Sequence, residues 1–122
     1  MTLARHLAAL DLLRARAFPE EGYHLTELAV EEPTEEQAEA EREALALLLE
    51  TRWGPPRLVS LYSLVARAGA GEDIPEPWGL ICASVPDIQL WRVDAHWVVL
   101  GLTRRGADGH GLLACVTGVD PP

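Results

Sequence analysis

The 122-residue sequence contains no lysine and no asparagine, and it has only two cysteines, one methionine and one phenylalanine. All ten basic residues are arginines, a bias that together with abundant alanine and leucine is typical of a GC-rich bacterial genome. No apolar run approaches the ~20 residues that span a bilayer, and Arg5, His6 and Asp11 interrupt any signal-peptide core. We therefore expect a bacterial, cytoplasmic protein with no membrane partner.

The sequence also lacks the short motifs of the commonest enzyme classes. It has no phosphate-binding P-loop, no glycine-rich dinucleotide fingerprint, no H-E-x-x-H, no C-x-x-C and no G-x-S-x-G. These absences exclude motif-bearing enzymes, but not enzymes whose sites are built from scattered residues. We expect no cofactor and predict no catalytic residue.

The two cysteines lie in apolar runs, which predicts buried, unpaired thiols rather than a disulfide. Burial would also deactivate Cys115 as a nucleophile paired with His24 or His96.

The repeated spacing of Asp94-x-His96 and Asp108-x-His110 offers metal-ligand residue types. The two pairs fall at opposite ends of a predicted strand, roughly 25 Å apart at the usual rise per residue. They cannot share one ion, so we predict no metal site.

Charge is distributed unevenly along the chain. The segment from Glu20 to Glu43 holds ten acidic residues and one arginine, whereas the remainder holds nine of each sign, so the net charge of −9 belongs to this segment. Such a surface opposes nucleic-acid binding and speeds encounter with a basic protein partner. The alternative is a solvated face that keeps the protein soluble. The candidate partner-binding residues are Glu31, Glu32, Glu35, Glu36, Glu39 and Glu43.

Two long amphipathic helices are predicted. Leucines at three- and four-residue steps indicate a helix over 2–17. A second helix over 35–52 begins with a capping box formed by Thr34 and Gln37, and it ends at Gly54, which two prolines follow. Repulsion between Glu39 and Glu43 on this helix, worth a few tenths of a kcal/mol, favours a role for its acidic face in binding a partner.

The C-terminal third predicts a three-strand meander from Ile88 to Val93, from His96 to Arg104 and from Gly111 to Val119. The segment from Tyr23 to Val30 is predicted to pair with it as an edge strand. Between the first two meander strands, Asp94-Ala95 is short enough for a tight turn. Because alanine disfavours the left-handed conformation that such a turn needs, a longer or bulged loop is an alternative.

Pairing of Val93 with His96 fixes a register in which Arg92 faces Trp97, an arrangement that favours a cation–π contact. Trp91 and Trp97 then lie on opposite faces, and both faces of the meander are apolar. A sheet with one face in water would alternate apolar and polar residues. The meander is therefore covered on both sides, closes over a pocket, or packs against a second subunit.

The middle of the chain predicts shorter elements. We expect a short strand over 57–61 and a short helix over 62–68, with the proline-containing segment 74–77 as a connector. The apolar segment 78–85 fits either a strand or a helix, and its length favours a strand. The fold class is α+β: an antiparallel sheet of four to five strands that ends in the meander, with two main helices packed on it. Residues 1–122 form a single domain.

Three functions fit these observations. The first is a small, non-enzymatic binding protein of the inhibitor, immunity or chaperone type; the layout is loosely similar to that of small bacterial α+β families such as immunity proteins and secretion chaperones. The second is a small-molecule pocket enclosed by the curved sheet, binding or catalytic. The third is a structural homodimer joined through the meander. The residues that would line the pocket or interface are Tyr62, Trp91, Arg92 and Trp97.

Overall fold

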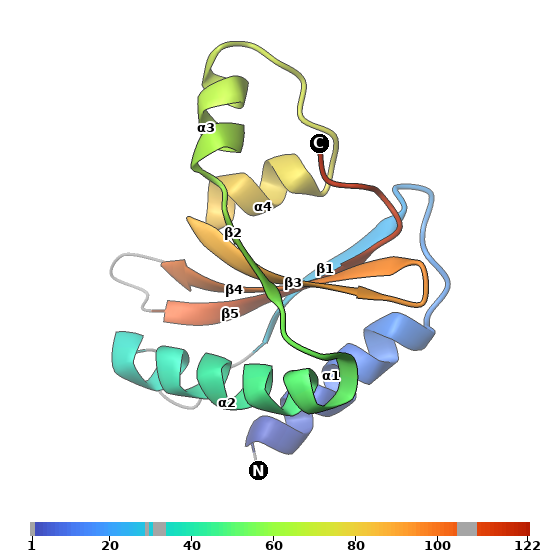
Figure 1. The fold of residues 1–122 in the computed structure, drawn as a ribbon, viewed down its shortest axis with the longest axis vertical. Helices are drawn as coiled ribbons and strands as arrows, with labels where there is room; N and C mark the ends of the chain where they lie inside the picture. Colours follow the sequence, from blue (N-terminus) through green and yellow to red (C-terminus); the bar gives the residue numbers. More distant parts are fainter. Residues whose placement is uncertain (1, 29, 31–33, 105–109) are drawn as a thin grey trace.

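A computed structural model describes residues 2–28, 30, 34–104 and 110–122, with the side chains of Thr2 and Arg104 excepted. Five strands form one antiparallel sheet in the order β1-β5-β4-β3-β2, and helices cover both of its faces (Figure 1). In chain order the elements are α1 (Thr2–Ala15), β1 (Tyr23–Leu28), α2 (Glu35–Trp53), β2 (Arg57–Ser60), α3 (Tyr62–Gly69), α4 (Trp78–Ser84), β3 (Asp87–Val93), β4 (His96–Arg104) and β5 (His110–Thr117). The α+β class and the antiparallel sheet are confirmed.

The meander of β3, β4 and β5 forms the centre of the sheet. Its register places Val93 opposite His96 and Arg92 opposite Trp97, as predicted. The segment from Tyr23 pairs with β5 and forms one edge, and β2 pairs with β3 and forms the other. The meander is thus flanked on both sides by strands of the same chain.

The turn between β3 and β4 has two residues, and the longer or bulged loop considered from the sequence is wrong. Asp94 and Ala95 both take positive φ, 49° and 67°. This left-handed pair matches the right-handed twist of the flanking strands, which is why two-residue hairpins select it despite the cost at a residue with a Cβ.

The larger core lies between the sheet and the two long helices, α1 and α2. Alternation along β3 directs Trp91 and Val93 to this side, where the Trp91 indole Nε1 donates a hydrogen bond to the Gly54 carbonyl oxygen at 3.0 Å. The predicted cap is present, because the Thr34 hydroxyl accepts a hydrogen bond from the backbone N–H of Gln37 at 3.1 Å.

Buried polar side chains link the two long helices. His6 Nε2 and Glu41 Oε1 are 2.9 Å apart, and both residues are almost fully buried. The side-chain nitrogen of Gln37, Nε2, donates to the second Glu41 oxygen, Oε2, at 3.0 Å. The carboxylate is therefore satisfied on both oxygens, as burial requires.

The second core lies on the opposite face of the sheet, beneath α3 and α4 (Figure 1). The predicted strand over 78–85 is wrong, since Trp78–Ser84 forms the helix α4. Trp78, Ile81, Cys82 and Val85 are all buried at the three- and four-residue spacing of a helix. The remaining residues of this segment are mostly apolar too, which conceals the period in the sequence.

Both faces of the meander are therefore covered by helices of this chain, which is the first of the three arrangements that its apolar faces allowed. Among the described residues, no helix combines the length and apolar character needed to cross a membrane.

Candidate functional site

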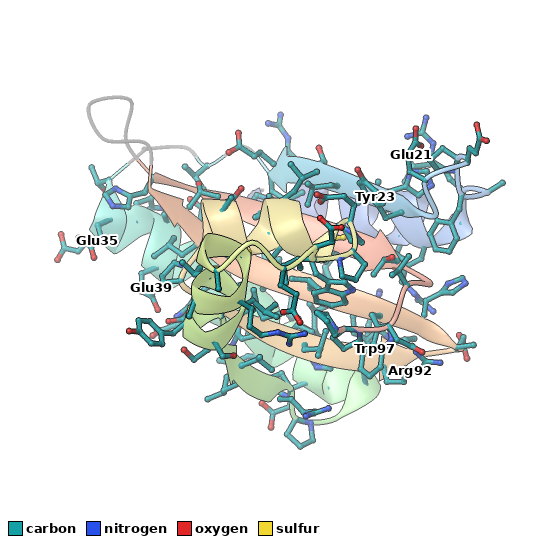
Figure 2. All side chains as sticks on the ribbon, turned by 90° about the horizontal axis from the view of Figure 1, so that it is seen from above. Glu21, Tyr23, Glu35, Glu39, Arg92 and Trp97 are labelled. Carbon is teal, nitrogen blue, oxygen red and sulfur yellow. The ribbon has the colours of Figure 1, made fainter. Side chains whose placement is uncertain are left out.

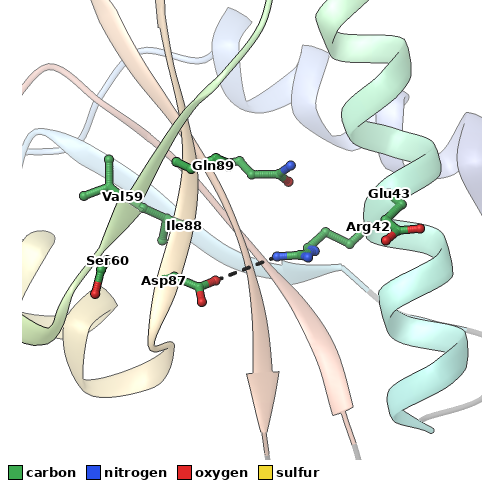
Figure 3. A pocket seen from close by; sticks show the side chains of 8 residues that line it. Arg42, Glu43, Val59, Ser60, Asp87, Ile88 and Gln89 are labelled. Atoms are coloured by element: carbon green, nitrogen blue, oxygen red, sulfur yellow. Dashed lines mark ion pairs between the residues drawn. The ribbon is translucent and has the colours of Figure 1, made fainter.

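A groove separates α2 from the β2 edge of the sheet (Figure 3). Its volume is about 550 Å³, and it is lined by residues from α2, β2 and β3. Such a volume lies within the range of sites that hold a small molecule or a short peptide segment. The lining residues are Arg42, Glu43, Leu58, Val59, Ser60, Asp87, Ile88 and Gln89.

The groove exists because β2 extends the sheet beyond the reach of α2. Leu58 stands opposite Gln89, and Ser60 stands opposite Asp87, so the side chains of these four residues share the face that α2 covers elsewhere. At this edge, however, Leu58 is left 79% exposed.

A smaller hollow of about 260 Å³ continues the groove along α2. It shares Glu43 and Gln89 with the first hollow and adds Leu47, Glu50 and Pro56 among its lining residues. Leu47 is 66% exposed on the helix side of the groove. Two leucines from separate elements thus present apolar surface to the same depression.

Arg42 lies at the centre of the groove and joins the helix to the sheet. Its guanidinium is paired with Glu39 one helical turn away, and it reaches Asp87 at the start of β3 with an N–O distance of 3.8 Å (Figure 3). Among the described residues, Arg42 Nε and Gln89 Oε1 are buried without a hydrogen-bond partner. Buried polar atoms of this kind are normally satisfied, and both residues line the groove, so one donor and one acceptor beside it lack a partner.

The pairing of Arg42 with Glu39 changes the interpretation of the acidic helix. From the sequence, repulsion between Glu39 and Glu43 suggested a face kept for a partner. The structure places a compensating guanidinium beside Glu39, so that repulsion is largely offset. Glu43 lines the groove and is exposed.

The six predicted acidic residues are not equivalent. Glu36, Glu39, Glu43 and Glu50 follow one stripe of α2 at three-, four- and seven-residue steps, and Leu47 lies in the same stripe. Glu35 is exposed at the start of the helix, about 100° around its axis from Glu36. Glu31 and Glu32 lie outside the described residues.

The four residues predicted to line a pocket or interface are dispersed. Trp91 is buried in the core beneath α1 and α2, whereas Trp97 lies half-buried on the opposite face. Tyr62 begins α3 and is 80% exposed. Only Arg92 and Trp97 contact one another, with the guanidinium carbon 4.6 Å from the ring centroid (Figure 2).

The Arg92–Trp97 pair holds the C-terminal segment in place. The Trp97 indole Nε1 donates to Asp120 Oδ1 at 2.9 Å, and Arg92 approaches the same oxygen at 3.5 Å. The predicted cation–π contact is therefore present, and it belongs to a surface cluster that anchors the chain after β5.

Both cysteines are free and buried, in agreement with the sequence. Burial raises the pKa of the Cys115 thiol to about 12, because no charged partner offsets the cost of removing a thiolate from water. His24 and His96 instead lie beside Phe18, at ring-centroid distances of 5.5 and 4.7 Å.

The metal pattern proposed and rejected from the sequence includes Asp108, which lies outside the described residues. In the part of the chain that the structure describes, no three His, Cys, Asp or Glu side chains are grouped as metal ligands.

Of the residues that line the groove, only Glu43 was among those predicted from the sequence. Arg42 carried one signal, since it is the single basic residue between Glu20 and Glu43. Leu58 and Gln89 carried none, because their role depends on how β2 meets β3 and on where α2 lies. Comparison with known proteins gives no match: no family model, no curated protein and no solved structure matches this chain at a significant level.

Proposed function

We propose that this protein is a non-enzymatic binding protein whose groove between α2 and β2 receives a basic segment of a partner protein. The observation that carries the proposal is the composition of the groove. It combines exposed leucines on both sides, a buried donor and acceptor without partners, and an excess of negative charge.

The charge excess follows from the lining residues themselves. Glu43, Glu50 and Asp87 contribute three carboxylates, and Arg42 contributes one guanidinium, so the described lining carries a net charge of minus two. Glu39, which is paired with Arg42, adds one more carboxylate close to the lining. An arginine or lysine of a partner would gain from this field, which also speeds encounter at low salt.

The apolar contribution comes from Leu47 and Leu58, which face solvent across the groove. Covering exposed leucine contributes roughly 25 cal/mol per Å² of apolar surface removed from water. A partner segment that carries both basic and apolar side chains therefore fits this surface better than a purely basic one.

The test is selection of a phage-displayed random heptapeptide library on the immobilised protein. We expect enriched peptides that contain arginine or lysine together with leucine, isoleucine or valine. Affinity of a fluorescent enriched peptide, measured by anisotropy, should fall as salt is raised.

A pair of double variants makes this test specific. Glu43→Gln/Glu50→Gln removes two charges from the groove, and we expect a loss of affinity of about fivefold or more. Glu20→Gln/Glu21→Gln removes two charges from the exposed loop before β1 and should leave affinity nearly unchanged. Failure to enrich any peptide family, or equal effects of the two double variants, would overturn the proposal.

A further inference from the structure

We infer that the groove takes its partner segment as an added β-strand, paired with the free edge of β2 in an extended conformation. This inference rests on the proposed function and specifies how the same site recognises its partner. It starts from the position of β2, which is the last of the described strands on this side of the sheet and pairs there with β3 alone.

The hydrogen-bond pattern identifies which backbone groups of β2 are free. In an antiparallel ladder, residues alternate between those that bond to the neighbouring strand and those that point away from it. The Leu61 amide donates to the Pro86 carbonyl oxygen at 2.9 Å, in continuation of the β2–β3 register. Residues bonded to β3 recur at every second position of the strand. The backbone groups of Val59 and Arg57 therefore point toward β3, and those of Leu58 and Ser60 point toward solvent.

The outward residues are also the residues whose side chains border the groove. Leu58 and Ser60 line it, whereas Val59 packs partly into the core on the other face. An added strand along β2 would thus pair with the amide and carbonyl groups of Leu58 and Ser60. Its alternate side chains would point into the groove, toward Gln89 and the carboxylates of α2.

The length of β2 limits the length of the added strand. Pro55 and Pro56 precede the strand directly, and α3 begins two residues after Ser60. Proline has no amide hydrogen to donate, so pairing is confined to about four residues. The partner segment is therefore short, extended, and carries basic and apolar side chains at alternate positions.

A second copy of this chain fits the same edge poorly. Pairing of two β2 strands would bring two grooves of net negative charge together, each carrying Glu43 and Asp87. Like charges in close opposition disfavour such a contact. Charge complementarity instead assigns the edge to a basic segment of a different protein.

The other free edge of the sheet provides a comparison. Among the described strands β1 likewise pairs with one neighbour, β5, and it is longer than β2. Neither described hollow borders it, because both are lined by residues of α2, β3 and the β2 region. We therefore place the docking site at the β2 edge.

The experiment uses the enriched fluorescent peptide with two variants at one position. Leu58→Pro removes the outward amide donor and no bond to β3, and it should weaken binding about tenfold. Leu58→Ala keeps that donor and shortens the side chain, and its effect should be smaller. Circular dichroism and denaturant melting establish that both variants fold.

Peptide N-methylation gives a second measurement that does not depend on the variants folding. Two methylated peptides are compared, one methylated on every odd-numbered amide and the other on every even-numbered amide. The peptide whose methyl groups face β2 should lose binding, and the other should keep most of it. Equal affinity of the two methylated peptides, or unchanged affinity in a folded Leu58→Pro protein, would overturn strand addition while the groove remains a peptide site. Self-association that Leu58→Pro abolishes in sedimentation experiments would instead assign the edge to a second copy.

Discussion

The two faces of the sheet are covered by helices of different character. On one face, α1 and α2 are 14 and 19 residues long. Polar pairs join these helices to each other and to the turn between β3 and β4. His6 meets Glu41, Asp11 meets Arg52, and Arg14 meets the hairpin residue Asp94. On the other face, α3 and α4 are 8 and 7 residues long and are held mainly by apolar packing.

This difference shows how a short helix depends on its surroundings. An isolated helix below about 12–15 residues is marginal in water, so α4 depends on Trp78 and Ile81 inserting into the second core. The Trp78 indole Nε1 also donates to the Val119 carbonyl oxygen at 3.0 Å, which ties α4 to the C-terminal segment. The long helix α2 is capped by the Thr34 hydroxyl, whereas α3 and α4 have no side-chain cap and are stabilised by the sheet beneath them.

The largest effect is expected from truncating Trp78, the buried anchor of the face that α3 and α4 cover. Trp78→Ala should lower the free energy of unfolding by about 3–5 kcal/mol, because it opens a cavity in the second core and loses one hydrogen bond. Chemical denaturation monitored by circular dichroism gives the value. Val65→Ala in α3, where Val65 is 48% exposed, is the control and should change stability little. A loss below about 1 kcal/mol for Trp78→Ala would mean that this face contributes little to the fold.

On the long-helix face, the buried carboxylate is the corresponding target. Glu41→Gln keeps the size of the side chain but removes the charge that His6 and Gln37 contact. We expect a loss of about 1–3 kcal/mol, since at least one buried polar group is left poorly satisfied. Glu43→Gln makes the same chemical change at an exposed position of the same helix and should lie within about 0.5 kcal/mol of the parent protein. Equal denaturation midpoints for the two variants would contradict a stabilising role for the pair.

Alkaline pH should lower the free energy of unfolding through the buried thiol of Cys115. Burial raises the pKa of Cys115 to about 12, above that of an exposed thiol. Between about pH 9 and 12 the unfolded thiol is ionised and the folded one is protonated, so the unfolded state binds fewer protons and stability falls by about 1.4 kcal/mol per pH unit. Denaturation of the parent protein and of Cys115→Ala at pH 8 to 10.5 isolates this contribution. The same pH slope for both proteins would exclude it.

The smallest expected effect concerns the start of α2. Thr34→Ala removes the hydroxyl that accepts from the Gln37 amide, and it should cost about 0.5–2 kcal/mol. Thr51→Ala, on the same helix, removes a hydroxyl that donates to the Leu47 carbonyl oxygen and caps nothing, so it serves as the matched control. If the two threonine variants unfold at the same denaturant concentration, the cap does not contribute to the stability of this long helix.

The same contrast explains what could be predicted from the sequence. The first hairpin of the meander was predictable to the register, because its alternation and turn spacing are local and the pairing of Val93 with His96 follows by counting. Both ends of the helix α2 were predictable, from Thr34 at its start and Gly54 at its end. The helix α4 was predicted as a strand, because a nearly continuous apolar run hides which residues the sheet will bury.

The groove could not be predicted for a different reason. Its walls come from three separate segments, and no pattern within any one of them indicates the gap between α2 and β2. The acidic face of α2 was visible in the sequence, and Glu43 does line the groove. The pairing of Arg42 with Asp87 depends on tertiary packing alone, so the charge balance at the site could not be counted from the chain.

The strand order has a consequence for synthesis on the ribosome. β1 is the first strand made, yet among the described strands it pairs with β5, the last strand made, and Leu28 stands opposite Leu112. Until residues 110–117 have emerged from the exit tunnel, β1 has no strand to pair with, and the apolar stripe of α1 lacks much of its core. Pairing between such distant segments forms slowly and leaves apolar surface open to other molecules in the meantime.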